Sequence, residues 1–177
     1  MVFEVEIRSF ISKEKYEELL EFLNKNAEFL KESDQESHYF DSDKDLRIQR
    51  NDEYCKVWLK KGLMHETKRQ EIELRFDKKD FEKAEELFGE IGFRPKVKWF
   101  RKRREYSWLG FDVCLDYTKG YGYILEIEKL CEEKEKNQYL EEIKSRFKRL
   151  NIPITSKEDF DKKLRDYENN WEKLTKV

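Results

Sequence analysis

Hydrophobic and polar residues alternate along much of the chain up to about residue 130, and the alternation begins almost at the first residue. The opening stretch, residues 3–10, reads FEVEIRSF, which predicts a strand. Because side chains on a strand point alternately to its two faces, Glu4, Glu6 and Arg8 share one face. Two carboxylates and a guanidinium are therefore predicted to lie together, either on ordinary wet surface or in the lining of a site.

Four other segments have the spacing of helices. Residues 12–26 start with a serine N-cap and carry apolar residues three and four positions apart. Residues 78–92 repeat this pattern and end at a glycine. In this second predicted helix, the residues expected to face the core are Phe81, Ala84, Leu87, Phe88 and Ile91. Two more helices are predicted over residues 132–150 and 156–174.

The remaining segments are predicted to be short strands joined by charged or glycine turns. Four strand candidates lie within residues 37–76 and three within 96–130. Their connections are too short for the crossovers of a parallel sheet, so we expect antiparallel strands. No linker rich in Gly, Ser or Pro divides the chain. We expect one domain over residues 1–177, with a β-rich part at 1–130 and buttressing helices at 131–177.

Composition narrows the class of protein. Charged residues make up 44% of the 177 residues, yet the net charge is only −2, which argues against a general nucleic-acid binder. The three cysteines have no metal-ligand spacing. We find no signal peptide and no apolar run long enough to cross a membrane. These features predict a cytoplasmic protein without nucleic-acid or membrane partners.

Acidic pairs recur on the predicted strands, at positions 4/6, 71/73 and 126/128, and Arg101 and Arg103 share one face of another strand. One solvated face explains any single strand. Glutamate has poor strand propensity, however, so its repeated use favours a charged interior, as in a closed barrel with a polar lumen. The four tryptophans are interpreted as packing residues rather than as platforms for a nucleobase.

Clustered carboxylates without His or Cys suit a hard cation, Mg²⁺ or Mn²⁺. Clustered Arg and Lys suit phosphoryl oxygens, which accept paired hydrogen bonds from guanidinium. Together they predict a site for a polyphosphate group, where positioning and charge neutralisation favour phosphoryl transfer.

An ordered set of motifs resembles the CYTH family, also called triphosphate tunnel metalloenzymes. The opening Glu4, Glu6 and Arg8 are similar to its ExExK. The motifs that follow are HYFDSDKDLRIQ (38–49), WLKKG (58–62), RQEIE (69–73), RKRREY (101–106) and LDYTKGYGYILEIE (115–128). Together with GFRP (92–95), they look most like the class IV adenylate cyclase (CyaB) branch.

The resemblance implies an α+β fold in which eight antiparallel strands close into a β-barrel, the triphosphate tunnel, with peripheral helices. It implies a small triphosphate substrate, such as tripolyphosphate or ATP, and Mg²⁺ or Mn²⁺ as cofactor. The implied metal residues are Glu4, Glu6, Asp116, Glu126 and Glu128. The implied phosphate-binding residues are Arg8, Arg47, Lys60, Arg69, Arg101 and Arg103. The implied catalytic set is Arg8 with Glu71 and Glu73, which would line the tunnel and orient its cations.

Two departures from the family pattern matter. Arg8 stands where lysine is usual, and guanidinium stays protonated, so Arg8 binds phosphate but does not act as a base. Gln49 stands where a second arginine is expected. Three functions therefore stay open: triphosphate hydrolysis, the general chemistry of the family; synthesis of cyclic AMP from ATP; and a non-catalytic polyphosphate- or nucleotide-binding module. The sequence also leaves open whether the chain is a homodimer.

Overall fold

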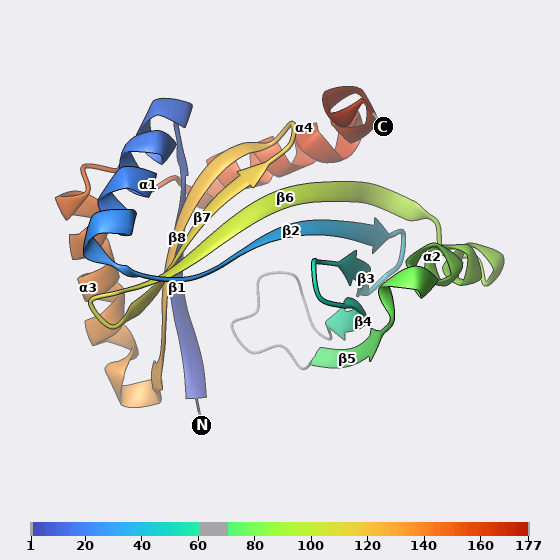
Figure 1. The fold of residues 1–177 in the computed structure, drawn as a ribbon, viewed down its shortest axis with the longest axis horizontal. Coiled ribbons are helices and arrows are strands. Elements are labelled where there is room, and N and C mark those ends of the chain that lie inside the picture. Colours follow the sequence, from blue (N-terminus) through green and yellow to red (C-terminus); the bar gives the residue numbers. More distant parts are fainter. Residues whose placement is uncertain (1, 61–70, 177) are drawn as a thin grey trace.

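The computed structural model describes residues 2–60 and 71–176, with the backbone alone of Val2, Lys60 and Glu71 (Figure 1). The strands are β1 (Val2–Ile11), β2 (Glu28–Phe40), β3 (Asp45–Arg50), β4 (Cys55–Lys60), β5 (Glu71–Phe76), β6 (Pro95–Trp108), β7 (Phe111–Thr118) and β8 (Gly122–Glu132). The helices are α1 (Lys13–Asn26), α2 (Phe81–Glu90), α3 (Lys136–Arg149) and α4 (Lys157–Thr175). Short 3-10 turns, η1 (Lys78–Asp80) and η2 (Glu133–Glu135), precede α2 and α3. No helix in the described part of the chain is long and apolar enough to span a membrane.

The strands form one antiparallel sheet in the order β1-β8-β7-β6-β2-β3-β4-β5. The α+β class and the antiparallel pairing are therefore confirmed. The expected closed barrel is wrong for this structure, because β1 and β5 form no ladder among the described residues and remain the two ends of the sheet.

The register explains why the ends do not meet. Residues 101–108 of β6 pair with β7 on one side and with residues 28–35 of β2 on the other. Residues 36–39 of β2 pair with β3. The strands outside this ladder therefore form two groups, attached to its opposite ends. This stagger keeps the edge strands β1 and β5 from lying opposite each other.

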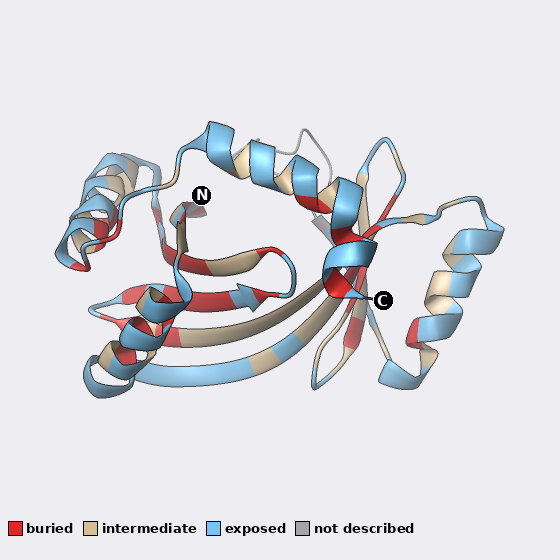
Figure 2. Ribbon diagram, turned by 90° about the horizontal axis from the view of Figure 1, so that it is seen from above, coloured by how far each residue is buried: buried red, intermediate tan, exposed pale blue. Residues whose placement is uncertain are grey.

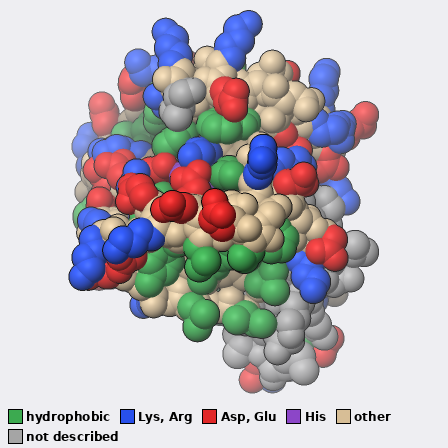
Figure 3. All heavy atoms as spheres, turned by 90° about the vertical axis from the view of Figure 1, so that its right-hand side faces the viewer, with side chains coloured by type: hydrophobic (Ala, Val, Ile, Leu, Met, Phe, Trp, Pro, Cys, Tyr) green, Lys and Arg blue, Asp and Glu red, His purple; other side chains and the backbone are tan. Residues whose placement is uncertain are grey.

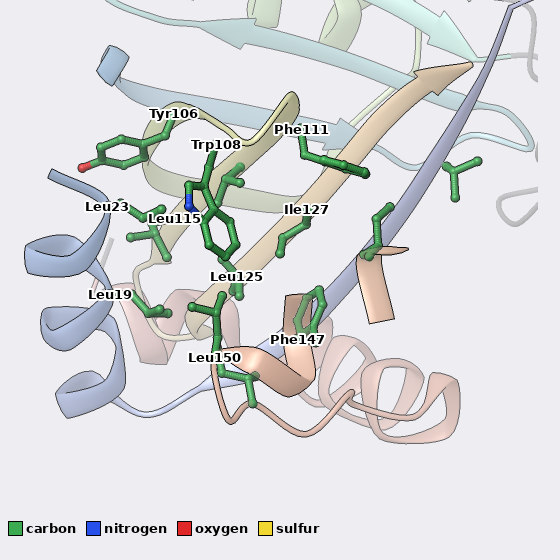
Figure 4. Close-up of a cluster of buried hydrophobic side chains, with 14 of the residues drawn as sticks. Leu19, Leu23, Tyr106, Trp108, Phe111, Leu115, Leu125, Ile127, Phe147 and Leu150 are labelled. Carbon is green, nitrogen blue, oxygen red and sulfur yellow. The ribbon is translucent and has the colours of Figure 1, made fainter. Parts of the chain in front are cut away.

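One face of the sheet carries Glu4, Glu6 and Arg8, and we call it the inner face. On the outer face of β1, β8, β7 and β6, a large core packs against α1 and α3, as Figure 4 shows for Leu19, Trp108 and Phe147. Alternation along the strands creates this division, since Val5 is buried while its neighbours Glu4 and Glu6 are exposed. In Figure 1, α1 and α3 lie beyond these strands on the side away from β3–β5, so the inner face is turned toward β3–β5.

Helix α2 covers the outer face of the other half of the sheet, where Phe81 packs with Phe40 and Ile48. Its stripe of inward residues is narrower than the sequence predicts, because Leu87 and Ile91 are 60% and 59% exposed. Short α2 reaches β3 and the Phe76 end of β5 but leaves Ile72 and Leu74 of β5 exposed. Figure 3 views this end of the molecule and shows hydrophobic side chains gathered on its surface.

Helix α4 packs on the inner face, unlike the other helices. Phe10, Trp99 and Ile124 each lie two residues from a charged inner-face position, and all three belong to the cluster beneath α4. The helix is fixed by hydrogen bonds from Tyr167 Oη to the Lys98 carbonyl (2.9 Å) and from Trp171 Nε1 to the Lys96 carbonyl (3.1 Å). In Figure 2 the buried positions of α4 lie toward the strands. The inner face is therefore apolar at this end.

The first half of β2, residues 28–35, is a strand that the sequence did not predict. Its residues are mostly exposed and polar on both faces, so they lack the apolar alternation of a half-buried strand. Pairing with β6, rather than burial of an apolar face, holds these residues in a strand. Glu32 accepts hydrogen bonds from Lys102 and Arg104 on β6.

Replacing Gly120 by alanine tests the contact between α4 and the β7–β8 turn. Gly120 has φ +75°, and an added Cβ would lie 2.7 Å from the Leu174 Cβ. We expect Gly120→Ala to lower the free energy of unfolding by about 3 kcal/mol, from backbone strain plus overpacking. Gly110→Ala is the matched control, because its φ is +76° but the nearest atom is a lysine ammonium at 4.0 Å. It should cost only about 1 kcal/mol in denaturant unfolding. Equal losses would contradict the packing of α4 on this turn.

Candidate active site

The charged residues of β1 and β8 lie side by side on the inner face. The register pairs Glu6 with Glu128 and Arg8 with Glu126. On β7, Asp116 continues the same face, and Arg103 of β6 pairs with it. The alternating strands thus assemble a layer of acids and bases that are far apart in sequence.

Three of the acids gather at one point. Ligand oxygens of Glu4, Glu6 and Glu128 all lie within 4.8 Å of one another. Burial raises the pKa of Glu128 to about 8, and the nearby carboxylates, Glu126 first, add to the shift. Burial also raises the pKa of Glu6, although Arg8 opposes it. Together the three close carboxylates are a set of hard oxygen donors that a divalent cation would stabilise.

The other two acids are held by Arg103. Its guanidinium donates to both oxygens of Asp116, at 2.8 and 2.7 Å, and to Glu126 Oε1 at 3.1 Å. Both carboxylates are almost fully buried, with 2% and 5% of their surface exposed. Burial alone would lower the pKa of Arg103, but Glu126 and Asp116 raise it well above its ordinary value. These ion pairs hold the Arg103 guanidinium in a fixed position on the inner face.

Two further arginines flank this group. Arg8 donates to Glu6 Oε1 at 2.6 Å and lies 3.6 Å from Glu126 Oε2. Arg101 donates to the Gln35 amide oxygen at 3.0 and 2.5 Å and reaches Asp116 at 3.4 Å. Three guanidinium groups therefore lie on the same face as the acidic trio, in a geometry suited to binding phosphoryl oxygens.

The β3–β5 half contributes a second group of charges. Arg47 donates to both Asp45 oxygens at 2.6 Å and to Tyr39 Oη at 3.1 Å. On the neighbouring strands, Glu73 accepts from Lys56 and Arg75, each at 2.9 Å. Each of these cations already has a carboxylate partner that holds it in place.

The structure thus brings together most of the residues that the family resemblance implies. The acids separate into the trio Glu4, Glu6 and Glu128 and the Arg103-bound pair Asp116 and Glu126. Arg47 and Glu73 lie on β3 and β5 instead, apart from the trio along the sheet order. The side chains of Lys60 and Glu71, and the whole of Arg69, lie outside the described residues.

Sequence reasoning missed three residues of this face. Gln35 lies in the part of β2 that was not predicted, although alternation counted back from Ser37 would have placed it here. Lys56 and Trp58 share the inner face of β4, a relation readable from period two alone. Gln49, which replaces an expected arginine, is buried and donates to Ser37 Oγ at 2.9 Å. It therefore serves the β2–β3 pairing rather than adding a charge.

The sequence is similar to a known domain family and to a curated protein. A family model for the CYTH domain matches residues 3–159. A protein of Methanocaldococcus jannaschii named "Putative adenylate cyclase MJ0240" is 34% identical over 162 residues, covering 84% of this chain and 90% of that protein.

Solved structures share the fold. A conserved hypothetical protein from Pyrococcus furiosus has a TM-score of 0.65 at 28% identity, covering 85% of this chain and 91% of its own. A Hippeastrum protein described as "Putative adenylyl cyclase HpAC1", with a dominant triphosphatase activity, has a TM-score of 0.64 at 23% identity, covering 89% and 93%. At that identity the second likeness shows the fold alone. The family match over most of the chain and the M. jannaschii relative together show that the chain belongs to the CYTH domain family.

Proposed function

We propose that this chain is a metal-dependent enzyme that hydrolyses the terminal phosphate of a small triphosphate compound. The observation that supports it most is the inner face itself, where Glu4, Glu6 and Glu128 come within 4.8 Å of one another beside the arginine group of β1 and β6. A binder of anions alone would gain nothing from carboxylates beside its ligand, because they repel phosphate.

The acidic trio fits Mg²⁺ or Mn²⁺, since it offers three oxygen donors and neither nitrogen nor sulfur. Such an ion would neutralise phosphate charge and orient the reacting group. The chain's own part is to bind and position. Arg8, Arg101 and Arg103 would hold phosphate oxygens, and the Arg103 bonds to Asp116 and Glu126 keep that cation from swinging away.

A second candidate is formation of cyclic AMP and pyrophosphate from ATP. The name of the M. jannaschii relative favours it. Both reactions need the same triphosphate-binding residues. They differ in the nucleophile, because hydrolysis places water in line with the terminal phosphorus, whereas cyclisation places the ribose 3′-hydroxyl in line with the α-phosphorus.

Product analysis by phosphorus NMR and chromatography tests the proposal. Purified protein incubated with Mn²⁺ or Mg²⁺ and tripolyphosphate should release orthophosphate and pyrophosphate. Cyclic AMP and pyrophosphate from ATP would instead establish the cyclase. Binding of tripolyphosphate by calorimetry without any product would overturn both and leave the binding module.

Removing one carboxylate of the trio should weaken metal binding. We expect Glu6→Gln to lower the Mn²⁺ affinity, measured by calorimetry, by at least about tenfold and turnover in parallel. Glu172→Gln is the matched control, since Glu172 is an exposed residue of α4. An unchanged Mn²⁺ affinity in Glu6→Gln would remove the trio as the metal site.

The raised pKa of Glu128 predicts how stability depends on pH without metal. Its pKa moves from 4.5 to about 8 on folding, so the folded chain holds a proton that the unfolded chain has lost. Stability should therefore fall as the pH rises from about 5 to about 8. Chemical unfolding in chelator should show this loss in the wild type and less of it in Glu128→Gln. A Glu128→Gln profile that runs parallel to the wild-type profile would contradict the assignment.

A further inference from the structure

One buried donor on the inner face is left without a partner. Three buried side-chain nitrogens in the described part of the chain have no hydrogen bond: His38 Nδ1, Trp58 Nε1 and Arg146 Nε. His38 packs against Phe81 of α2, and Arg146 lies on α3, so both belong to the outer face. Of these three residues, Trp58 is the one that lies on the inner face.

Trp58 is placed there by its strand. In the register of β4, Trp58 is opposite Arg47 of β3 and Glu73 of β5, and it is 8% exposed. Two cations stack on its indole ring, with the Arg47 guanidinium carbon 5.2 Å and the Lys56 ammonium 4.1 Å from the ring centroid. The indole is thus the centre of the positive group on this half of the sheet.

Two carboxylates near Trp58 in the register have described side chains, and both are already engaged. Both oxygens of Glu73 accept hydrogen bonds, one from Lys56 and one from Arg75. Both oxygens of Asp45 accept from Arg47. A buried N–H without an acceptor is unfavourable, and buried indole nitrogens usually find one. The surroundings of this donor are cationic, so the acceptor that suits it best is an oxygen of an anion.

We propose that Trp58 is a further ligand-binding residue, whose indole N–H donates to a phosphate oxygen of the triphosphate group, with Arg47 and Lys56 neutralising the charge of that oxygen. The proposal rests on the proposed function, because it takes the triphosphate as the ligand of the inner face. The nitrogen is shielded from solvent in the unliganded chain. Binding therefore requires the groups that cover this nitrogen to move aside.

The indole N–H itself reports the bond. In the full chain labelled with ¹⁵N-tryptophan, the four indole resonances can be assigned by single Trp→Phe substitutions. Adding inorganic tripolyphosphate with Mg²⁺ should move the Trp58 resonance downfield, as expected for a new hydrogen bond to a charged acceptor. The Trp171 resonance is the internal control, because its Nε1 already donates to the Lys96 carbonyl.

A matched pair of variants measures the effect on affinity. Trp58→Phe keeps an aromatic ring for Arg47 and Lys56 to stack on, and removes the donor together with the smaller ring of the indole. We expect it to bind tripolyphosphate about tenfold more weakly by calorimetry, and at most a modest fall in the melting temperature from the lost packing. Trp171→Phe, which loses a bond beneath α4, should lower the melting temperature and leave the affinity unchanged.

Each outcome supports or overturns the proposal. An unmoved Trp58 resonance in a chain that binds tripolyphosphate overturns it and leaves the proposed function intact. Equal affinity of Trp58→Phe and the wild type for tripolyphosphate also overturns the proposal and leaves the proposed function intact. Failure of the wild type to bind tripolyphosphate at all overturns both. Should Trp58→Phe fail to fold, the shift of the wild-type resonance still shows whether the indole N–H bonds to the ligand.

Discussion

The ladder between β2 and β6 holds the molecule together, and everything else is attached to one of its ends. It runs from Glu28 to Phe40 on β2 and joins the longest strands of the sheet. At one end it carries β7, β8 and β1 with the core under α1 and α3, and at the other it carries β3, β4 and β5 with α2. Helices cover much of the outer face in both halves, and the charged residues described above lie on the inner face.

Many charged groups lie close together on the inner face because carboxylates and guanidinium groups there form distinct ion pairs. Arg103, with Arg101 beside Asp116 and Arg8 beside Glu126, neutralises two carboxylates that could not otherwise stay buried. In the described part of the chain, the trio Glu4, Glu6 and Glu128 makes one ion pair, between Glu6 and Arg8, and the pKa values of Glu6 and Glu128 are raised. Excess negative charge is thus concentrated in one place. Under the proposed function, a divalent cation would relieve that imbalance and would therefore bind this subset of acids rather than all five.

The apolar end of the inner face limits how a ligand can lie. Below α4 the side chains of Phe10 and Phe160 are 4.4 Å apart between ring centroids, and Trp99 and Tyr121 are 4.5 Å apart. Rings packed at these distances leave no room for a further group between them. Under the proposed function, a bound triphosphate would therefore lie on the charged residues beside these packed rings rather than between the rings.

The sequence by itself determined the elements and the faces of their residues, because the period of a strand or helix is local and depends only on neighbouring positions. The alternation around Glu4, Glu6 and Arg8 is an example, as are the helix at Lys13–Asn26 and the ordered family motifs. Tertiary structure alone decided what those faces meet. The polar strand at residues 28–35 exists only because β6 pairs with it, and the stagger along that ladder keeps the sheet open. Pairing between distant strands also decided that Arg103 holds Asp116 and Glu126, and that Trp58 is left with an unpartnered donor among the described residues. Such contacts join positions far apart in the chain, so no local pattern could reveal them.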